Sequence, residues 1–246
     1  MSDRNTGLAR PLARHGLHDR VAELLTGLPR GRLLDVPAGM GALARRLAEQ
    51  WFTVTCSDIN ADGFLARELP FEQADLAAAL PFADGAFDYV TCIEGVEHLE
   101  NPFRAVRELA RVLRPGGMLV LSLPNYLSIE QRLKFLITGS FDKPVPTEKV
   151  RALAPQDVAM LHLAPLGYGQ LKLMLELAGL EVERLERDKS KHRQAYLLWP
   201  LVLAIKFYTR LWPRSARQRY LLDEVEGPAL LTGGNTLIIL ARKTRR

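Results

Sequence analysis

The chain of 246 residues contains only two cysteines and lacks a long apolar run. Cys56 and Cys92 lie in separate apolar stretches, which excludes a disulfide framework and a four-cysteine zinc site. The most apolar segment extends for eleven residues, from Ala195 to Ile205, and contains Pro200, whereas a membrane-spanning helix needs about twenty. The first twenty residues are polar and arginine-rich, with no apolar core of a signal peptide. We therefore expect a cytoplasmic protein.

The excess of positive over negative charge is also small. The 33 basic side chains exceed the 28 acidic ones by only 5, which is too little to predict nucleic-acid binding. The hydrophobic content of 48% is enough for one large core, so we expect a single α/β domain over residues 1–246.

Short apolar segments alternate with amphipathic ones from Leu33 onward, which is the pattern of βαβ units and a mostly parallel sheet. We predict helices at residues 42–50, from 102 to the Pro-Gly-Gly at 115–117, and at 170–179. Strands are predicted at residues 32–36, 52–59, 73–76, 87–93, 117–124, 180–186 and 236–243.

The stretch LLDVPAGMG, residues 33–41, predicts a buried strand that ends in a glycine turn, where backbone N–H groups approach a ligand closely. Gly39, Gly41 and Ala44 fit the dinucleotide pattern, with Asp58 at the distance of a ribose-binding acid, so an NAD(P)-dependent oxidoreductase is one interpretation. However, Asp35 closes the strand at the mouth of the loop, where its carboxylate would repel a pyrophosphate. S-adenosylmethionine carries an ammonium and a sulfonium and no phosphate, so the sign of this charge favours it.

Three segments together resemble the successive motifs of class I S-adenosylmethionine-dependent methyltransferases: LLDVPAGMG, VTCSDIN, and the run from FEQADL at residue 71 to SLPN at residue 125. The resemblance covers residues 31–125 and is closest to the type 11 and type 12 enzymes that act on small molecules and on glycan or lipid precursors. It implies a Rossmann-like, seven-stranded, mostly parallel sheet with an antiparallel last strand, helices on both faces and helical insertions.

The resemblance also implies which residues bind S-adenosylmethionine and its product S-adenosylhomocysteine. Asp58 would bind the ribose hydroxyls, Ile59 would contact the adenine, and Asp75 and Leu76 would lie at its amino edge. The residues around the methionine moiety and the cofactor amino group would be Asp35, Ala38, Gly39, Gly41, Ile93 and Glu94. Pro37 stands where most members have glycine; since proline fixes φ and has no N–H, it stiffens the loop.

The stretch IEGVEHLENP follows the predicted fourth strand and carries candidate catalytic groups. We take His98 as the candidate base for a hydroxyl acceptor, with Glu97 and His162 as further catalytic candidates. The E-x-x-E-H spacing also resembles the divalent-metal site of small-RNA 2′-O-methyltransferases and of some quinone O-methyltransferases. We expect no metal, and the alternative is a metal set of Glu94, Glu97, His98 and His162. An Asn/Asp-Pro-Pro-aromatic motif is absent after this strand, so methylation of nucleic-acid bases is disfavoured.

We divide the domain into an N-terminal helical cap (1–30), a cofactor-binding core (31–125), an acceptor lid (126–167) and an apolar, basic helical insertion (188–234). In this last segment Lys206, Arg210 and Arg214 recur every four residues and would follow one helix face. Residues 195–219 would then bind an anionic membrane at its inner face, or pack on the domain or in a homodimer.

We therefore predict O-methylation of a small molecule, a glycan or a lipid-linked intermediate. The alternatives are the oxidoreductase and a cofactor-binding module without activity that anchors a partner to the membrane.

Overall fold

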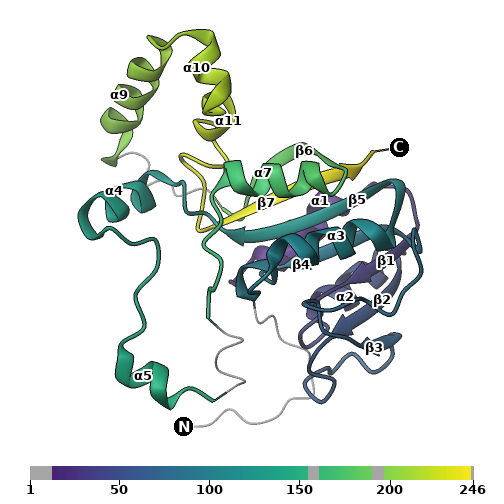
Figure 1. Ribbon diagram of the computed structural model, residues 1–246. Coiled ribbons are helices and arrows are strands. Elements are labelled where there is room, and N and C mark those ends of the chain that lie inside the picture. Colours follow the sequence, from purple (N-terminus) through teal and green to yellow (C-terminus); the bar gives the residue numbers. More distant parts are fainter. Residues whose placement is uncertain (1–12, 155–160, 190–196, 245–246) are drawn as a thin grey trace.

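The computed structural model describes residues 13–154, 161–189 and 197–244, and shows one large sheet between two layers of helices (Figure 1). The predictions for residues 1–12 of the cap, 155–160 of the lid, 190–196 of the insertion and the last two arginines lie outside the described residues.

The sheet has seven strands in the order β3-β2-β1-β4-β5-β7-β6. β7 alone runs opposite to the other six strands, so the predicted sheet with an antiparallel last strand is confirmed. The strands are β1 (Arg32–Asp35), β2 (Thr53–Asp58), β3 (Phe71–Gln73), β4 (Phe87–Ile93), β5 (Leu113–Pro124), β6 (Leu180–Arg187) and β7 (Thr236–Lys243).

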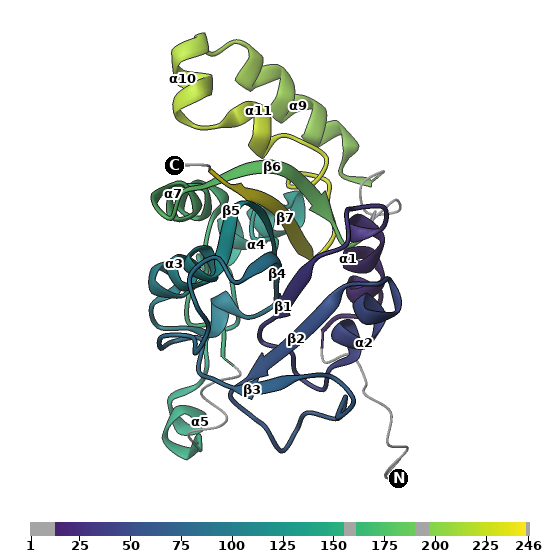
Figure 2. The same ribbon diagram turned by 90° about the vertical axis from the view of Figure 1, so that its right-hand side faces the viewer.

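Helices cover both faces of the sheet, which is why most residues of β4 and the second half of β5 are buried (Figure 2). α1 (Leu17–Leu25) and α2 (Ala42–Glu49) bury their apolar sides in one core cluster. α3 (Pro102–Val112) and α7 (Tyr168–Leu177) do the same in a second cluster on the opposite face.

Most element boundaries differ from prediction by one or two residues, and β5 begins four residues early, at Leu113. Two of the differences have a clear local cause. The third strand comprises residues 71–73 and not 73–76, because Asp75 accepts the N–H of Ala77 (2.8 Å) in a local turn that ends the extended backbone. α3 ends at Val112, since Leu113 already has extended backbone and pairs with Phe87 of β4.

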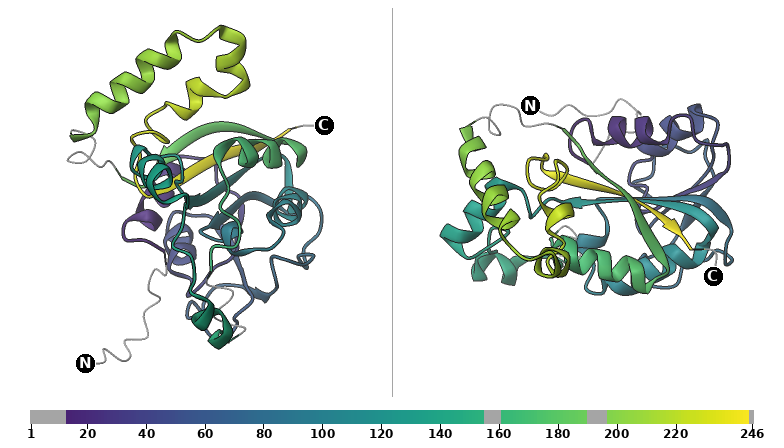
Figure 3. Two further views of the ribbon diagram at one scale, coloured as in Figure 1. Left: turned by 60° about the vertical axis from the view of Figure 1, so that its left-hand side comes forward. Right: turned by 90° about the horizontal axis from the view of Figure 1, so that it is seen from above.

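The remaining helices follow the central strands. α4 (Ile129–Thr138) and α5 (Thr147–Ala152) come after β5. Between β6 and β7 lie α9 (Trp199–Arg210), α10 (Arg214–Arg219) and α11 (Leu222–Val225), which we call the helical arm. Figure 3 shows the arm standing out from the sheet, on the same side as α4. Among the described helices, none is both long and apolar enough to span a bilayer.

The expectation that Lys206, Arg210 and Arg214 follow one continuous helix face is wrong. α9 ends at Arg210, and Arg214 begins α10. Pro213 stands between the two helices, where it has no N–H to continue the hydrogen-bonding pattern of α9.

Candidate active site

The predicted cofactor residues gather at one edge of the sheet, where the parallel strands β1 to β4 have their carboxyl ends. The order of the strands reverses between β1 and β4, since β2 and β3 lie on one side of β1 and β4 and β5 on the other. In open α/β sheets this reversal leaves a crevice for a ligand beyond the strand ends.

The loop after β1 is held against the end of β2 by two backbone donors. Ala38 donates its N–H to the carbonyl of Ser57 (2.9 Å), and Gly39 donates its N–H to Oδ2 of Asp58 (2.8 Å). Asn60 donates to the other oxygen of Asp58 (2.9 Å). The carboxylate predicted to bind the ribose is therefore fixed in place beside the glycine loop.

Gly41 cannot be replaced without a clash. Its φ is +86°, and a Cβ there would lie 2.5 Å from Cβ of Ala66 and 2.8 Å from the ring of Phe64. Both the backbone conformation and the close packing require glycine at this position.

Asp35 is buried at the end of β1, where Oγ1 of Thr91 donates a hydrogen bond to its Oδ1 (2.7 Å). Burial raises the pKa of Asp35 to about 7, an effect that the hydrogen bond from Thr91 opposes and the charge of Asp58 adds to. A cationic ligand would stabilise the ionised form, whereas a diphosphate would meet two carboxylates.

The other predicted cofactor residues border the same edge. Ile59 is 62% exposed although it is a large apolar side chain, directly after Asp58. Asp75 is exposed as well, whereas Ala38, Leu76 and Ile93 are buried. Glu94 is half-buried and accepts a hydrogen bond from Oγ1 of Thr236 (3.0 Å).

Pro37 packs against Gly95, a residue that sequence reasoning missed. A Cβ on Gly95 would lie 2.6 Å from Cδ of Pro37 and 3.2 Å from Sγ of Cys92. The ring of Pro37 therefore requires glycine at position 95, because any side chain there would collide with it.

The structure brings Glu97, His98 and His162 together, although the two histidines are 64 positions apart in the sequence. One ligand atom from each side chain lies within 4.8 Å of the other two. Glu97 and His98 belong to a short 3₁₀ helix, η1 (Val96–His98), and the two imidazole rings meet edge to face with centroids 5.1 Å apart. Glu94 is not part of this three-residue group.

Hydrogen bonds fix the tautomer of His98. Its Nδ1 lies 3.0 Å from the carbonyl of Leu161, which can only accept, so Nδ1 carries the proton and Nε2 keeps its lone pair in the neutral ring. Burial lowers the pKa of His98, which favours this neutral form.

His162 is oriented in the same way by Tyr126, a residue of the predicted acceptor lid, and by Asp142, which sequence reasoning did not identify as functional. Its Nδ1 lies 3.3 Å from both Oδ2 of Asp142 and the hydroxyl of Tyr126. The hydroxyl of Tyr126 in turn donates to Asp142 (2.7 Å). No spacing signal could have revealed this contact, because the three residues come from separate parts of an irregular segment.

Glu97 is fully buried, and neither of its carboxylate oxygens has a hydrogen-bond partner among the described residues. Burial, together with the charge of Glu94, raises its pKa to about 8. A buried carboxylate without a partner is energetically costly unless a cation or a proton compensates its charge. Glu97 is therefore a candidate functional residue.

Comparison with known proteins shows that the chain is similar to methyltransferases. Residues 34–121 match the family model described as a methyltransferase domain, a span that includes the glycine loop, β4 and η1. The chain is 31% identical over 177 residues to the ubiquinone biosynthesis O-methyltransferase of Psychrobacter arcticus, covering 61% of this chain and 68% of the relative. It is 30% identical over 194 residues to the 27-O-demethylrifamycin SV methyltransferase of Amycolatopsis mediterranei, covering 72% of this chain and 63% of the relative.

Solved structures agree in fold. A Bacillus halodurans protein described as a candidate methyltransferase superposes with a TM-score of 0.57 at 22% identity, and the alignment covers 92% of this chain and 98% of that one. At this identity the similarity shows the shared fold alone.

Proposed function

The chain belongs to the class I S-adenosylmethionine-dependent methyltransferases, and on that premise we propose that it methylates an oxygen atom of a small molecule. The observation that carries this proposal is the group of Glu97, His98 and His162 at the sheet edge where the cofactor loop lies. Two similar proteins are named for ubiquinone biosynthesis O-methylation and for 27-O-demethylrifamycin SV, which supports an oxygen acceptor. Family membership also favours S-adenosylmethionine over the dinucleotide of the oxidoreductase alternative.

The residues at the strand ends fit S-adenosylmethionine, which supplies a methyl group on a sulfonium that becomes a neutral thioether as the acceptor attacks. Asp35 matches the positive charge of its methionine part, and Asp58 presents a fixed carboxylate for the ribose. Ile59 offers an exposed apolar side chain for one face of the adenine. The remaining proposed contacts are Ala38, Gly39, Gly41, Asp75, Leu76, Ile93 and Glu94.

His98 is the proposed base. Because Leu161 holds the proton of its Nδ1, the lone pair of Nε2 is left to accept the proton of an acceptor hydroxyl. His162 has the same arrangement through Asp142 and would bind or deprotonate the acceptor from the other side. Glu97, whose pKa of about 8 leaves it largely protonated at neutral pH, would ionise when one of the two imidazoles becomes protonated and would then stabilise that cation.

A divalent cation at the same group is a second candidate, and a specific observation favours it. Two imidazoles with engaged Nδ1 atoms and one buried carboxylate without a partner form a donor set that suits a first-row transition metal. Such a cation would lower the pKa of a bound hydroxyl. Glu94, the fourth residue of the predicted metal set, accepts from Thr236 and lies 3.8 Å from the guanidinium of Arg14 instead.

The parts of the chain around this edge receive proposed roles as well. Residues 13–30, with α1, would cover the cofactor, which the approach of Arg14 to Glu94 supports. Residues 126–154 and 161–167 would close over the acceptor, since Leu161 contacts His98 while Tyr126 and Asp142 contact His162.

Two measurements test the proposal. Calorimetry is expected to show binding of S-adenosylhomocysteine and none of NADH. Transfer of a labelled methyl group is then followed to a prenylated ortho-diphenol and to 27-O-demethylrifamycin SV, with an aliphatic amine as the control acceptor. Transfer to the amine but to neither hydroxyl compound would overturn the oxygen assignment.

The same assay separates the base from the metal. Prior treatment with EDTA, followed by addition of Mg²⁺, Mn²⁺ or Zn²⁺, leaves the rate unchanged if His98 acts alone. Loss of the rate and its recovery with one ion identify the metal alternative.

A further inference from the structure

The exposed side of α9 is apolar. Trp199, Leu203, Phe207 and Leu211 recur every four residues and span an arc of about 120° around the helix axis, and we call them the apolar stripe. All four are exposed, with Phe207 at 69% and Leu211 at 68%. An ordinary surface helix has polar residues on the side that faces water. The apolar stripe is therefore a candidate binding surface.

The opposite side of α9 already has its packing partners. Leu198, Leu201, Val202 and Ile205 pack into a small core with Ile129 of α4 and Leu231. The apolar stripe is therefore additional to the side that attaches the helix to the domain.

The end of α4, on the same side of the molecule as the arm, carries two more exposed apolar side chains. Leu136 and Ile137 are 80% and 82% exposed, more than any other large apolar side chain among the described residues. Figures 1 and 3 show α4 and α9 side by side on one side of the molecule, as their shared core requires.

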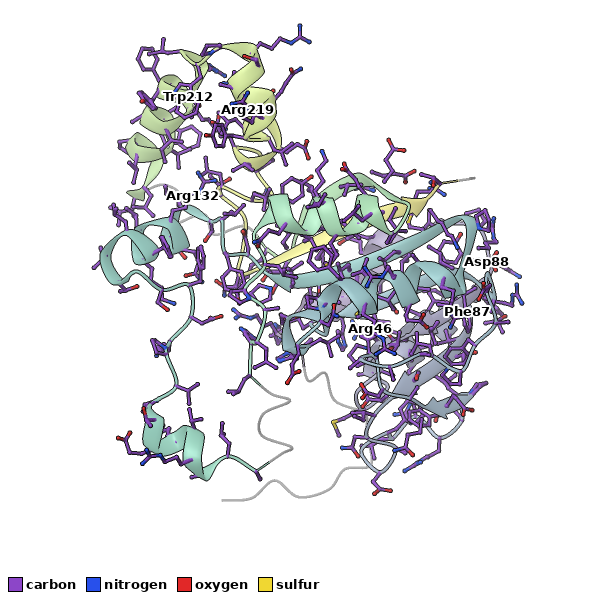
Figure 4. The ribbon with its side chains drawn as sticks, in the orientation of Figure 1. Arg46, Phe87, Asp88, Arg132, Trp212 and Arg219 are labelled. Carbon is purple, nitrogen blue, oxygen red and sulfur yellow. The ribbon has the colours of Figure 1, made fainter. Side chains whose placement is uncertain are left out.

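Arg132 ties α4 to the arm and so holds the two parts of this surface together. It is half-buried and donates to the carbonyls of Leu127 (2.8 Å) and Val225 (3.1 Å), which lie at the root of α4 and in α11. Figure 4 shows Arg132 beneath the arm, and Trp212 and Arg219 on the arm itself.

The charge of the arm decides among partners. Residues 197–225 contain two acidic side chains, Asp223 and Glu224, and five basic ones: Lys206, Arg210, Arg214, Arg217 and Arg219. Arg217 pairs with Asp223, so the cations that remain to meet a partner are Lys206, Arg210, Arg214 and Arg219. Lys206 and Arg210 lie beside the apolar stripe on α9. Apolar side chains that enter a lipid layer, with cations at their border that meet phosphate headgroups, are the features of an interfacial helix.

We propose that the apolar stripe and residues 135–137 of α4 together form a docking surface for a lipid bilayer that contains anionic headgroups. A second copy of the chain would bury the apolar side chains but would bring Lys206, Arg210, Arg214 and Arg219 toward their own copies. Charge complementarity therefore favours the bilayer over a homodimer.

The surface also narrows the class of acceptor, a step that rests on the proposed function. Phe135 stacks on Phe141 with centroids 4.4 Å apart, and Phe141 contacts Tyr126 at 5.5 Å. Tyr126 reaches His162. This row of rings leads from the docking surface to the histidines, so the acceptor is an amphiphile with a hydroxylated head and an apolar tail.

Vesicle flotation tests the docking surface without any acceptor. The intact chain is expected to float with vesicles of phosphatidylcholine and 30% phosphatidylglycerol, and at least tenfold less with phosphatidylcholine alone. Phe207→Ser/Leu211→Ser should abolish flotation, and Lys206→Gln/Arg210→Gln should weaken binding about fivefold for each charge removed.

The matched control is Leu173→Ser/Leu177→Ser, which removes two exposed leucines from α7 on another part of the surface. It should float like the unchanged chain, and all variants should keep the same thermal shift with S-adenosylhomocysteine as a check of folding. Equal flotation of Phe207→Ser/Leu211→Ser, which we call the stripe variant, and of the control would overturn the proposal. So would a chain that does not float and sediments as a dimer that Phe207→Ser/Leu211→Ser converts to a monomer.

The acceptor class has its own test. A prenylated diphenol in anionic vesicles should be methylated at least tenfold faster by the unchanged chain than by the stripe variant, while a short water-soluble diphenol should be methylated equally by both. Equal rates with the vesicle-held acceptor would overturn the acceptor class. Failure of transfer to both diphenols would count against the proposed function, and flotation would still decide the docking surface.

Discussion

The proposed cofactor edge and the proposed acceptor side of this molecule are built from different kinds of interaction. At the cofactor edge, short loops between adjacent strands supply backbone donors, a buried carboxylate and a glycine with no space for a side chain. On the acceptor side, the two histidines come from distant segments, and the neighbouring helices expose large apolar side chains. A ligand common to a whole family is recognised by local geometry, whereas an acceptor is recognised by an assembly that only the tertiary fold creates.

This difference has a consequence for mutation. Changes at the cofactor edge should affect binding and folding together, because its residues are also part of the core. Changes on the acceptor side should affect turnover while cofactor binding stays intact.

The largest effect on cofactor binding is expected for Gly41→Val. The new Cβ would collide with Ala66 and Phe64 while the backbone keeps a φ of +86°. We expect the affinity for S-adenosylhomocysteine to fall at least about 100-fold, measured by calorimetry, because the loop must move to relieve a clash of this size.

Gly139→Val on the acceptor side is the matched control. Gly139 has a similar φ of +66°, but nothing lies within 4 Å of the position of its Cβ. It should cost some stability and leave the cofactor affinity unchanged. If Gly41→Val bound the cofactor as tightly as Gly139→Val does, the close packing at Gly41 would not be needed for binding.

Asp35 gives a pH-dependent prediction of intermediate size. Because burial raises its pKa to about 7, the carboxyl is protonated below this value and must lose its proton to pair with a cationic ligand. The affinity for S-adenosylmethionine should therefore rise about tenfold per pH unit up to pH 7 and level off above it. Calorimetry from pH 5.5 to 8.5 measures this slope.

Asp35→Asn keeps the shape and removes the titration. Its affinity should be weaker at pH 8 by about 10- to 100-fold and independent of pH. The stability of the unchanged chain should fall as the pH rises from the ordinary value of 3.8 to about 7, since the folded state binds a proton there that the unfolded state does not. If the affinity of Asp35→Asn for S-adenosylmethionine kept the same dependence on pH, a group other than Asp35 would be responsible for that dependence.

The cofactor edge could be predicted from the sequence because its signals are local. The bounds predicted for β4 and β7, residues 87–93 and 236–243, coincide with the observed strands, since apolar and β-branched residues fill both segments. The position of Asp35 before Gly39 and Gly41 was enough to favour a cationic cofactor, and family membership is consistent with it.

The acceptor side was predictable only in part. His98 and His162 were identified, yet the roles of Asp142 and Tyr126 depend on how an irregular segment folds back over η1. The basic repeat of the arm was visible, but Pro213 breaks the helix that the repeat implied. Which side of α9 is buried depends on Ile129 and Leu231, residues that no spacing rule connects with it.

On the acceptor side, the larger effect should come from the histidines. His98→Asn and His162→Asn should each lower kcat by about 100- to 1000-fold, the usual range for loss of a general base or a ligand. The affinity for S-adenosylhomocysteine should stay within about twofold. A loss of cofactor binding equal to the loss of rate would show that the two sides are one site and would remove the distinction drawn above.

The smallest effect is expected for Tyr126→Phe, which removes a hydroxyl that donates to Asp142 (2.7 Å) and lies 3.3 Å from His162. Without it, Asp142 alone orients the imidazole, so kcat should fall about three- to tenfold and its pH profile should shift. Tyr168→Phe is the matched control, because Tyr168 is also a buried tyrosine that donates to a carboxylate, that of Glu224, away from the histidines. Both variants should lose about 1 kcal/mol of stability, but only Tyr126→Phe should change the pH profile. An identical decrease in kcat for both would mean that Tyr126 supports the fold and not His162, and the acceptor side would then depend on the two histidines and Asp142 without help from the rings that lead to them.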